Sequence, residues 1–350
     1  MNPIDAVDWL LDKSIVLGYS RVGYAVRRLW WPTGATSRQI AGRHVLITGG
    51  TSGIGKATAL ECAKAGAVVH ILGRSMERAL QAKDDLDRQA PGADIRVEEC
   101  DVSSLADVRR FAEDFTARVP ALTALVHDAG TMAKERTVTA EGHEVTFATH
   151  VLGPFLLTHL LRPVLAADGG ARVVFVSSGG MYGSKLRDDD PEYAESRYRG
   201  TTAYARTKRM QVVLAELWNE RLRDDEIVVD SMHPGWVDTP GVQTFLPVFR
   251  ALSRPIIRPP SQGADTIVWL ACGHDTEGTG ARFWHDRRAR STSWGPRPAD
   301  TPPQRARLWD YCAAATGVEA WSDSRASLDS SAALQHGSPL LSAIRHLTLM

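Results

Sequence analysis

The stretch VLITGGTSGIGKATAL, residues 45–60, runs from a short apolar segment through four glycines into a segment of good helix formers. Gly49, Gly50, Gly53 and Gly55 allow a tight backbone turn. A helix that begins directly after them offers free N–H groups and positive dipole potential to a phosphate. Glycines in this pattern can also form a tight turn that binds no ligand. Here they lie between a predicted strand and a predicted helix, which is the arrangement that dinucleotide binding requires. We therefore expect this stretch to bind a dinucleotide.

The same alternation continues along the chain. Near-continuous apolar runs typical of strands covered on both faces are HVLITGG, AVVHILGR, DIRVEEC, ALVHDAG, RVVFVSS and IVVDSMHPG. Helical segments are predicted between them, for example over 56–65 and over 76–90, where Ser75 is a plausible N-cap. The pattern predicts an α/β fold: one Rossmann-like doubly wound domain over 41–320, with a mostly parallel sheet of about seven strands and helices on both faces.

Composition narrows the class of protein. The chain has 350 residues, and Lys plus Arg equals Asp plus Glu at 41 each, so no overall field favours nucleic acid as a partner. The four cysteines (62, 100, 272 and 312) form no C-x-x-C pair, and no histidines cluster near them. We expect neither a disulfide framework nor a metal site, and a reducing, cytoplasmic location.

Both ends of the chain differ from the domain between them. Residues 1–40 are rich in aromatic and aliphatic side chains but are interrupted by charges, so no run reaches the roughly 20 residues of a spanning helix. We expect an amphipathic helical extension that packs on the domain or on a dimer mate. The alternative is a peripheral membrane contact, with Trp30 and Trp31 at the headgroup boundary. Residues 321–350 have the composition of a flexible tail.

The end of the second predicted strand indicates which dinucleotide binds. Enzymes that use NAD usually place an acid there for the ribose hydroxyls, but this chain has Gly73 and Arg74 in HILGRS. The planar, permanently charged guanidinium suits a 2′-phosphate. NADP(H) is therefore favoured over NAD(H), against the alternative of a solvated arginine before a helix.

Tyr204 and Lys208, in TAYARTKRM, lie one turn apart if this stretch is helical. They form either a solvated helix face or an acid with its tuning charge. A phenol with a pKa of about 10 is a poor acid-base catalyst at neutral pH, and we expect the nearby ammonium to lower that pKa. Ser178, at the end of RVVFVSS, could orient a substrate oxygen. Ser177 competes for that role, since adjacent strand residues point to opposite faces.

Together these motifs carry a family resemblance. The chain resembles short-chain dehydrogenase/reductases (SDRs) of the retinol-dehydrogenase-like branch, and within it the orphan oxidoreductases of the SDR-family-member-twelve type. The similarity covers roughly 40–320. It rests on the ordered motifs TGGTSGIGKATALE, VSSGGMYGSKL, YARTKRMQVVL, MHPGWVDTPGV and SQGADTIVWLA.

The resemblance implies the site residues. Ser178, Tyr204 and Lys208 would be the catalytic set, with Met181 and Tyr182 as pocket residues. The implied cofactor contacts are Gly49, Thr51, Ser52, Gly53, Ile54, Gly55, Arg74, Asp101, Val102, Ala129, Gly130, Tyr204, Lys208, Pro234, Gly235, Val237 and Thr239. The superfamily also often pairs through the helices preceding and containing the tyrosine, which makes a homodimer an expectation.

Two positions depart from the family pattern. Asp128, in HDAG, replaces the usual asparagine, so an acceptor-only carboxylate stands where an amide both donates and accepts. His150, in FATHVLGPF, replaces the asparagine of the family's catalytic tetrad. Its imidazole would join the proton relay as a fourth catalytic residue or be structural.

The region after Thr239 bears on the substrate. Residues 238–262 look like a proline-rich loop insertion whose apolar side chains would form a lid: Phe245, Leu246, Val248, Phe249, Ile256 and Ile257. These residues could equally pack the loop itself or a partner surface. We expect an NADP(H)-dependent oxidoreductase that acts on a hydrophobic carbonyl or its alcohol. The alternative, motivated by Asp128 and His150, is an impaired member that binds NADP(H) as a sensor or scaffold.

Overall fold

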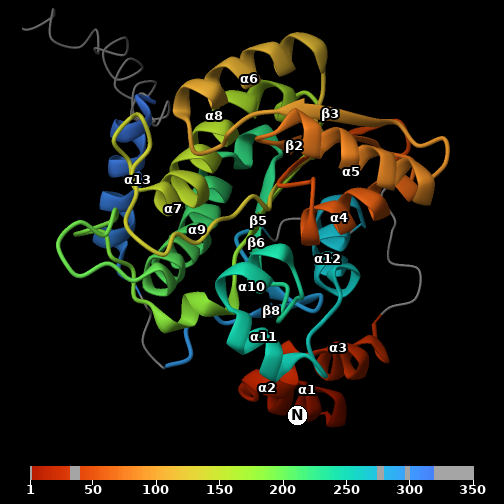
Figure 1. Cartoon of the computed structure of the whole chain (residues 1–350), viewed down its shortest axis with the longest axis vertical. Helices are drawn as coiled ribbons and strands as arrows, with labels where there is room; N and C mark the ends of the chain where they lie inside the picture. The colour runs from red at the N-terminus through yellow and green to blue at the C-terminus, as the bar shows by residue number, and fades with distance from the viewer. Residues whose placement is uncertain (1, 32–39, 274–279, 296–299, 319–350) are drawn as a thin grey trace, which may run out of the picture.

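The computed structural model describes residues 2–31, 40–273, 280–295 and 300–318 (Figure 1). The predicted C-terminal tail, 321–350, lies outside the described residues. Within the described part of the chain, no helix is both long and apolar enough to cross a membrane.

An eight-stranded sheet forms the centre of the domain, in the order β3-β2-β1-β4-β5-β6-β7-β8. Its strands are β1 (His44–Thr48), β2 (Val68–Gly73), β3 (Ile95–Glu99), β4 (Ala124–His127), β5 (Arg172–Val176), β6 (Val228–Met232), β7 (Phe283–His285) and β8 (Arg288–Arg290). The first seven run parallel, and β8 is antiparallel to β7. The Rossmann-like prediction is confirmed, with β8 in addition to the seven strands expected. The strand order reverses between β1 and β4, where open α/β sheets bind their ligands.

Helices cover both faces of the sheet (Figure 1). Three lie on one face: α4 (Gly53–Lys64), α5 (Met76–Gln89) and α12 (Pro260–Val268), which continues into a π-helical turn, Trp269–Gly273. On the other face lie α6 (Leu105–Arg118), α8 (Gly153–Ala166) and α9 (Gly200–Arg221). Helix α8 follows α7 (Val145–Phe147) through a π-helical turn, Ala148–Leu152. Short 3₁₀ turns occupy Gly179–Gly183 and Arg223–Asp225. Each face thus buries its own apolar core against the sheet.

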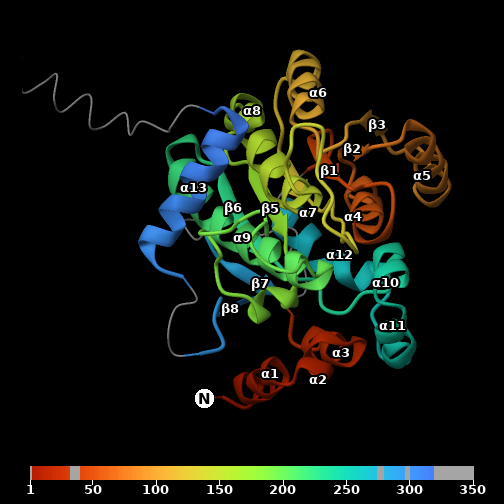
Figure 2. The ribbon, with the colours of Figure 1, turned by 60° about the vertical axis from the view of Figure 1, so that its left-hand side comes forward.

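A further helix, α13 (Pro302–Thr316), lies across α8 and α9 (Figure 2). The Trp309 ring packs 4.8 Å from both Phe155 and Trp218, and Leu308 and Cys312 are fully buried. This helix therefore covers the two helices through which the superfamily often pairs.

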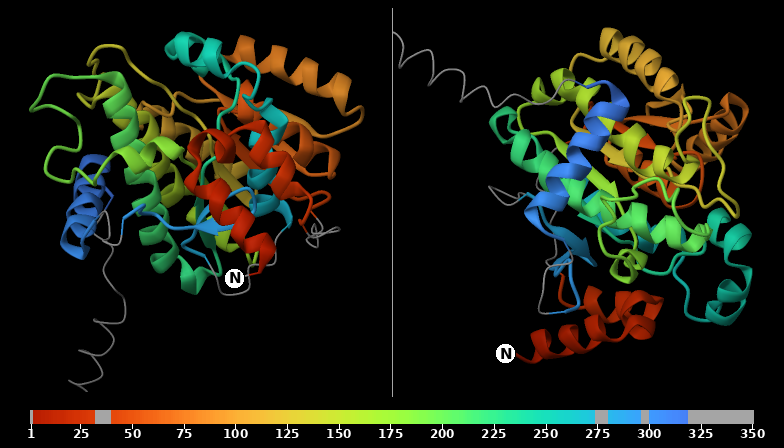
Figure 3. Two further views of the ribbon diagram at one scale, coloured as in Figure 1. Left: turned by 90° about the horizontal axis from the view of Figure 1, so that it is seen from below. Right: turned by 90° about the vertical axis from the view of Figure 1, so that its left-hand side faces the viewer.

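The N-terminal extension forms three short helices rather than one: α1 (Pro3–Lys13), α2 (Ile15–Tyr19) and α3 (Arg21–Arg28) (Figure 3). Ser14 and Ser20 cap the second and third by accepting bonds from backbone N–H groups. A buried ion network fixes the helices to the domain. Arg27 bonds Asp8 at 2.9 Å and Asp286 at 2.8 Å, and Arg258 bonds Asp286 at 2.6 Å.

The expected loop over 238–262 also contains helices, α10 (Pro240–Phe245) and α11 (Pro247–Ser253), followed by the start of α12. Each of these helices begins with a proline, whose fixed φ and missing N–H suit the first helical position. Three of the prolines that suggested a loop, Pro240, Pro247 and Pro260, therefore mark helix starts.

Candidate active site

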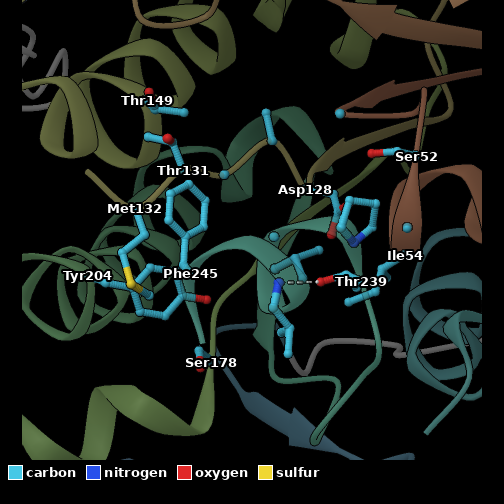
Figure 4. Close-up of a pocket in the computed structure, with 18 of the residues that line it drawn as sticks. Ser52, Ile54, Asp128, Thr131, Met132, Thr149, Ser178, Tyr204, Thr239 and Phe245 are labelled. Carbon is cyan, nitrogen blue, oxygen red and sulfur yellow. Dashed lines mark hydrogen bonds between the residues drawn. The ribbon is translucent and has the colours of Figure 1, made fainter. Parts of the chain in front are cut away.

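A cavity of about 630 Å³ opens at the carboxyl ends of the central strands. In Figure 4, Tyr204 and Met132 lie across it from Ser52 and Ile54, with Phe245 between them. Every predicted catalytic and cofactor residue lines this cavity except Gly55 and His150. The structure thus brings together residues that lie far apart along the chain.

The glycine loop has the shape that a nucleotide needs. Gly49 and Gly53 have φ of +72° and +55°, which side chains rarely adopt. A Cβ on Gly49 would lie 2.9 Å from the Ala129 Cα, and one on Gly55 would lie 2.5 Å from the Gly49 carbonyl oxygen. Gly55 therefore acts by close packing behind the loop, while the loop itself leaves room for a pyrophosphate beside the start of α4.

Two arginines occupy the edge of the cavity beyond β2. Arg74 and Arg78 both line it and are both exposed. Among the described residues, neither side chain has a hydrogen-bond or ion-pair partner, so both guanidinium groups are free to bind a phosphate. The sequence reasoning missed Arg78. Its signal is its place in the first turn of α5, directly after the segment that carries Arg74, at the same edge of the cavity.

Ser178, Tyr204 and Lys208 meet at the middle of the cavity. The Ser178 hydroxyl hydrogen-bonds Tyr204, whereas the Ser177 hydroxyl is buried and donates to the Lys208 carbonyl at 2.8 Å. The structure therefore places Ser178, not Ser177, beside the phenol.

The pKa of Tyr204 differs from the expectation. Burial raises it to about 12, although the bond with Ser178 opposes that rise, and the Asp128 charge adds to it. The expected lowering by Lys208 is absent from this structure. The Lys208 ammonium donates instead to the Val176 carbonyl at 2.8 Å and to the Gln211 Oε1 at 2.9 Å. Burial lowers the pKa of Lys208 to about 8.

Asp128 lies beneath the glycine loop. Burial raises the pKa of its carboxyl to about 7, opposed by the positive charge of Lys208 and by a hydrogen bond from the Gly55 N–H. Burial therefore favours the protonated form of this group. In its protonated form it both donates and accepts, as the family's amide would.

The His150 ring does not reach the cavity. Its Nε2 accepts the Thr131 N–H at 3.0 Å, and its Nδ1 bonds the Thr207 hydroxyl at 2.8 Å. Burial, together with Lys208, holds the pKa of His150 well below its usual range, so the ring is neutral. These contacts make the ring structural and do not support its expected part in a proton relay.

The backbone of His150 is connected to Lys208 through Gln211. Its carbonyl accepts the Gln211 Nε2 at 3.0 Å, and the other end of that amide holds Lys208. Gln211 was missed from the sequence. Its position three residues after Lys208 on α9 was the available signal.

Met181 and Tyr182 are not pocket residues, contrary to the expectation. Met181 is fully buried in a cluster with Val212 and Phe283. The Tyr182 ring stacks on Trp294, and its hydroxyl donates to the Ser291 carbonyl. The tight turn after Ser178 directs both side chains away from the cavity.

The lid side of the cavity carries no charged side chain. Its lining includes Met132, Trp236, Phe245, Leu246 and Phe249, and the rings of Trp236 and Phe249 meet edge to face at 5.0 Å. The charged residues that line the cavity are Arg74, Arg78, Asp101, Asp128 and Lys208, all on the glycine-loop side or at its centre. The cavity is therefore polar at one end and apolar at the other.

The N-terminal extension supports the loops of the site. A Cβ on Gly179 would lie 2.5 Å from the Tyr19 ring, and one on Gly235 would lie 2.7 Å from the Tyr19 carbonyl oxygen. That oxygen also accepts the Trp236 N–H at 2.8 Å. Tyr19 therefore lies directly beneath the loop after Ser178 and the loop after β6. No local signal in the sequence identifies it, because its partners lie far along the chain.

Comparison with known proteins agrees with this geometry. The profile of the short chain dehydrogenases matches residues 43–247. The chain belongs to this family. It is 42% identical over 255 residues to dehydrogenase/reductase SDR family member 12 of Bos taurus, covering 73% of this chain and 80% of the relative. It is 32% identical over 293 residues to retinol dehydrogenase 14 of Mus musculus, covering 79% and 86%.

The fold is similar to a crystal structure of an uncharacterised protein from Mycobacterium paratuberculosis, with a TM-score of 0.64, 27% identity, and coverage of 80% of this chain and 95% of that one. The family and its retinol-dehydrogenase-like relatives identify this short-chain dehydrogenase as an oxidoreductase that interconverts carbonyl and alcohol groups with NAD(P)(H).

Proposed function

We propose that this enzyme interconverts a hydrophobic aldehyde or ketone and its alcohol with NADP(H), and that Tyr204 is the acid-base residue. The observation that carries the proposal is the division of one cavity. Free arginines lie at one end, an apolar wall lies at the other, and the Ser178–Tyr204 pair lies between them. A polar cofactor and an apolar substrate would meet at these hydroxyls.

When bound, the nicotinamide supplies or accepts the hydride. Ser178 hydrogen-bonds the substrate oxygen and orients it. In reduction the Tyr204 hydroxyl donates its proton to that oxygen, and in oxidation the phenolate takes the proton back. The Lys208 ammonium lies 5.4 Å from the centre of the Tyr204 ring and would provide a donor for the cofactor ribose, while Gln211 and the Val176 carbonyl hold it in place. The apolar lid excludes water from the reaction.

The preference for NADP(H) rests on Arg74 and Arg78. Two unpaired guanidinium groups beside Gly73 suit a 2′-phosphate, and β2 itself ends in Gly73 and is followed by Arg74 rather than by the acid that usually binds the ribose hydroxyls of NAD(H). Asp101 and Val102 would contact the adenine, and Pro234, Gly235, Val237 and Thr239 the nicotinamide.

The apolar half of the cavity favours an uncharged lipid-like or polycyclic carbonyl. The name of the mouse relative, retinol dehydrogenase 14, refers to a lipid alcohol of this kind. We take 41–320 as the catalytic unit, with 238–262 as its substrate lid. A scaffold function is less well supported, because the Ser178, Tyr204 and Lys208 set is intact and His150 is structural. Since α13 covers α8 and α9, we do not propose a homodimer through those helices.

The test is a titration with NADPH and, separately, NADH, following energy transfer from tryptophan to the bound nicotinamide. NADPH should bind at least about tenfold more tightly, and Arg74→Asp should abolish that preference. Arg88→Asp, at the far end of α5, is the matched control and should keep it. Equal affinity for the two nucleotides would refute the NADP(H) assignment, and binding of neither would refute the cofactor site.

A further inference from the structure

The three N-terminal helices, within residues 3–28, have charged side chains on their buried side and large apolar side chains on their exposed side, the reverse of an ordinary surface helix. Helix α1 buries Asp8 and Leu11 against the domain, while Val7 and Leu10 face outward. A surface helix normally turns its apolar stripe to the core and its charges to water. The buried ion network explains the inversion, since Asp8 must reach Arg27 and Arg290 inside.

The outward face is apolar over all three helices. Leu10 on α1 is 61% exposed, Val22 on α3 is 42% exposed, and Leu29, directly after α3, is 82% exposed. The side chains of Trp9, Val16 and Leu17 are each about half exposed. Large apolar side chains gathered in this way on a soluble domain mark a contact surface.

The charges on the outward face have one sign. The three acids of the segment are all turned to arginines of the domain: Asp5 to Arg288, Asp8 to Arg290 and Asp12 to Arg290. Lys13 and Arg28 are exposed, and neither makes an ion pair with any residue that the structure describes. An apolar face flanked by unpaired cations is complementary to an anionic phospholipid surface.

The lid adjoins this face. The Arg21 N–H donates to the Ile256 carbonyl at 2.8 Å, three residues beyond the end of α11. On α11, Val248 and Leu252 are 72% and 80% exposed, while Phe249 lines the cavity. One short helix therefore shows apolar side chains both to the outside and to the substrate half of the cavity.

We propose that the outward face of residues 3–31, together with α11, docks on the surface of an anionic bilayer without crossing it. The lid then lies at the bilayer, and a substrate dissolved there reaches the cavity without crossing water. This last step rests on the proposed function, whereas the docking does not. A bilayer is favoured over a second copy as the occupant, because the unpaired cations Lys13 and Arg28 beside the apolar face would meet anionic headgroups, whereas the three acids of the segment are already paired with arginines of the domain.

The test is flotation of the full chain with vesicles of phosphatidylcholine alone and with phosphatidylserine added. The protein should float with the anionic vesicles. Leu10→Glu should weaken that binding about tenfold or more, since it replaces an inserted apolar side chain with a charge. Leu80→Glu, on the similarly exposed helix α5, is the matched control and should change nothing. The double variant Lys13→Glu/Arg28→Glu should bind anionic vesicles roughly tenfold or more weakly, and its binding to vesicles of phosphatidylcholine alone should not change.

NADPH binding by each variant shows that it is folded. Three results would overturn the docking: no binding to anionic vesicles by the unaltered chain, equal binding by the unaltered chain and Leu10→Glu, or a concentration-dependent dimer that Leu10→Glu converts to monomer. Failure of the proposed function is separate, because it would appear as intact flotation without turnover of any apolar carbonyl.

Discussion

The two halves of the cavity are built in different ways. The cofactor half is mainly backbone: glycines with positive φ, the ends of successive strands and the start of α4, each positioned by its own short stretch of sequence. The lid half is made of side chains from α10, α11 and the loop after β6, supported from below by Tyr19. Binding of a cofactor common to the family therefore depends on local sequence, whereas the substrate half depends on contacts between distant segments.

The largest expected effect lies where the halves meet. Tyr204→Phe removes the proton donor but keeps the ring, so kcat should fall by about 10²–10⁴ while NADPH binding is unchanged. Steady-state kinetics and the tryptophan titration measure the two quantities. Tyr182→Phe is the control, because its hydroxyl bonds Ser291 outside the cavity. Normal turnover by the Tyr204→Phe variant would disprove the acid-base role.

The support beneath the lid half is the next target. Arg27→Met leaves Asp8 and Asp286 buried with one partner fewer, so the free energy of unfolding should fall by about 3 kcal/mol, since Arg258 and Arg290 remain. Urea denaturation measures the change. Arg28→Met, at the exposed neighbour, should have almost no effect. If both variants unfold alike, the buried network does not anchor the extension.

A substitution in the apolar wall of the lid half should weaken substrate binding without changing cofactor binding. Phe249→Ala should raise KM for an apolar carbonyl about tenfold, the size of a lost apolar contact, with the NADPH affinity unchanged. Val248→Ala, one residue away but pointing out, is the matched control. Equal KM values for the two variants would show that the lid does not contact substrate.

The smallest expected effect lies in the cofactor half and depends on pH. The folded pKa of Asp128, about 7, lies above its ordinary value of 3.8 because of burial. Below about pH 4 the Asp128 carboxyl is protonated in both the folded and the unfolded chain, so its burial does not lower the stability of the protein. As pH rises from 4 to 7 the unfolded chain loses this proton first, so the folded protein loses stability. Asp128→Asn should therefore leave Tm unchanged at pH 4 and raise it by a few degrees at pH 8. A Tm difference independent of pH would contradict this account.

The sequence predicts well those structural features that depend on residues close together along the chain. The six predicted strands, the glycine loop and the start of α5 at Ser75 all follow from local patterns and are confirmed. Ser178 was preferred over Ser177 through the family motif, and the structure places its hydroxyl against Tyr204.

The differences arise from long-range contacts. Nothing near His150 in sequence shows that Thr131 and Thr207 bind both nitrogens of its ring. The pKa of Tyr204 depends on burial and on the engagement of Lys208 by Val176 and Gln211, neither of which follows from a four-residue spacing. The inverted face of α1 likewise depends on arginines near the other end of the domain.

The ion pair of Arg27 with Asp286 spans 259 residues. During synthesis, at about 5–20 residues per second, the three N-terminal helices leave the ribosome on the order of tens of seconds before that partner exists. For this interval both faces of the nascent segment are unsatisfied, with unpaired charges on one and bare apolar side chains on the other. The last strands to emerge are therefore the ones that fix the first helices, and the active site can reach its final geometry only at the end of translation.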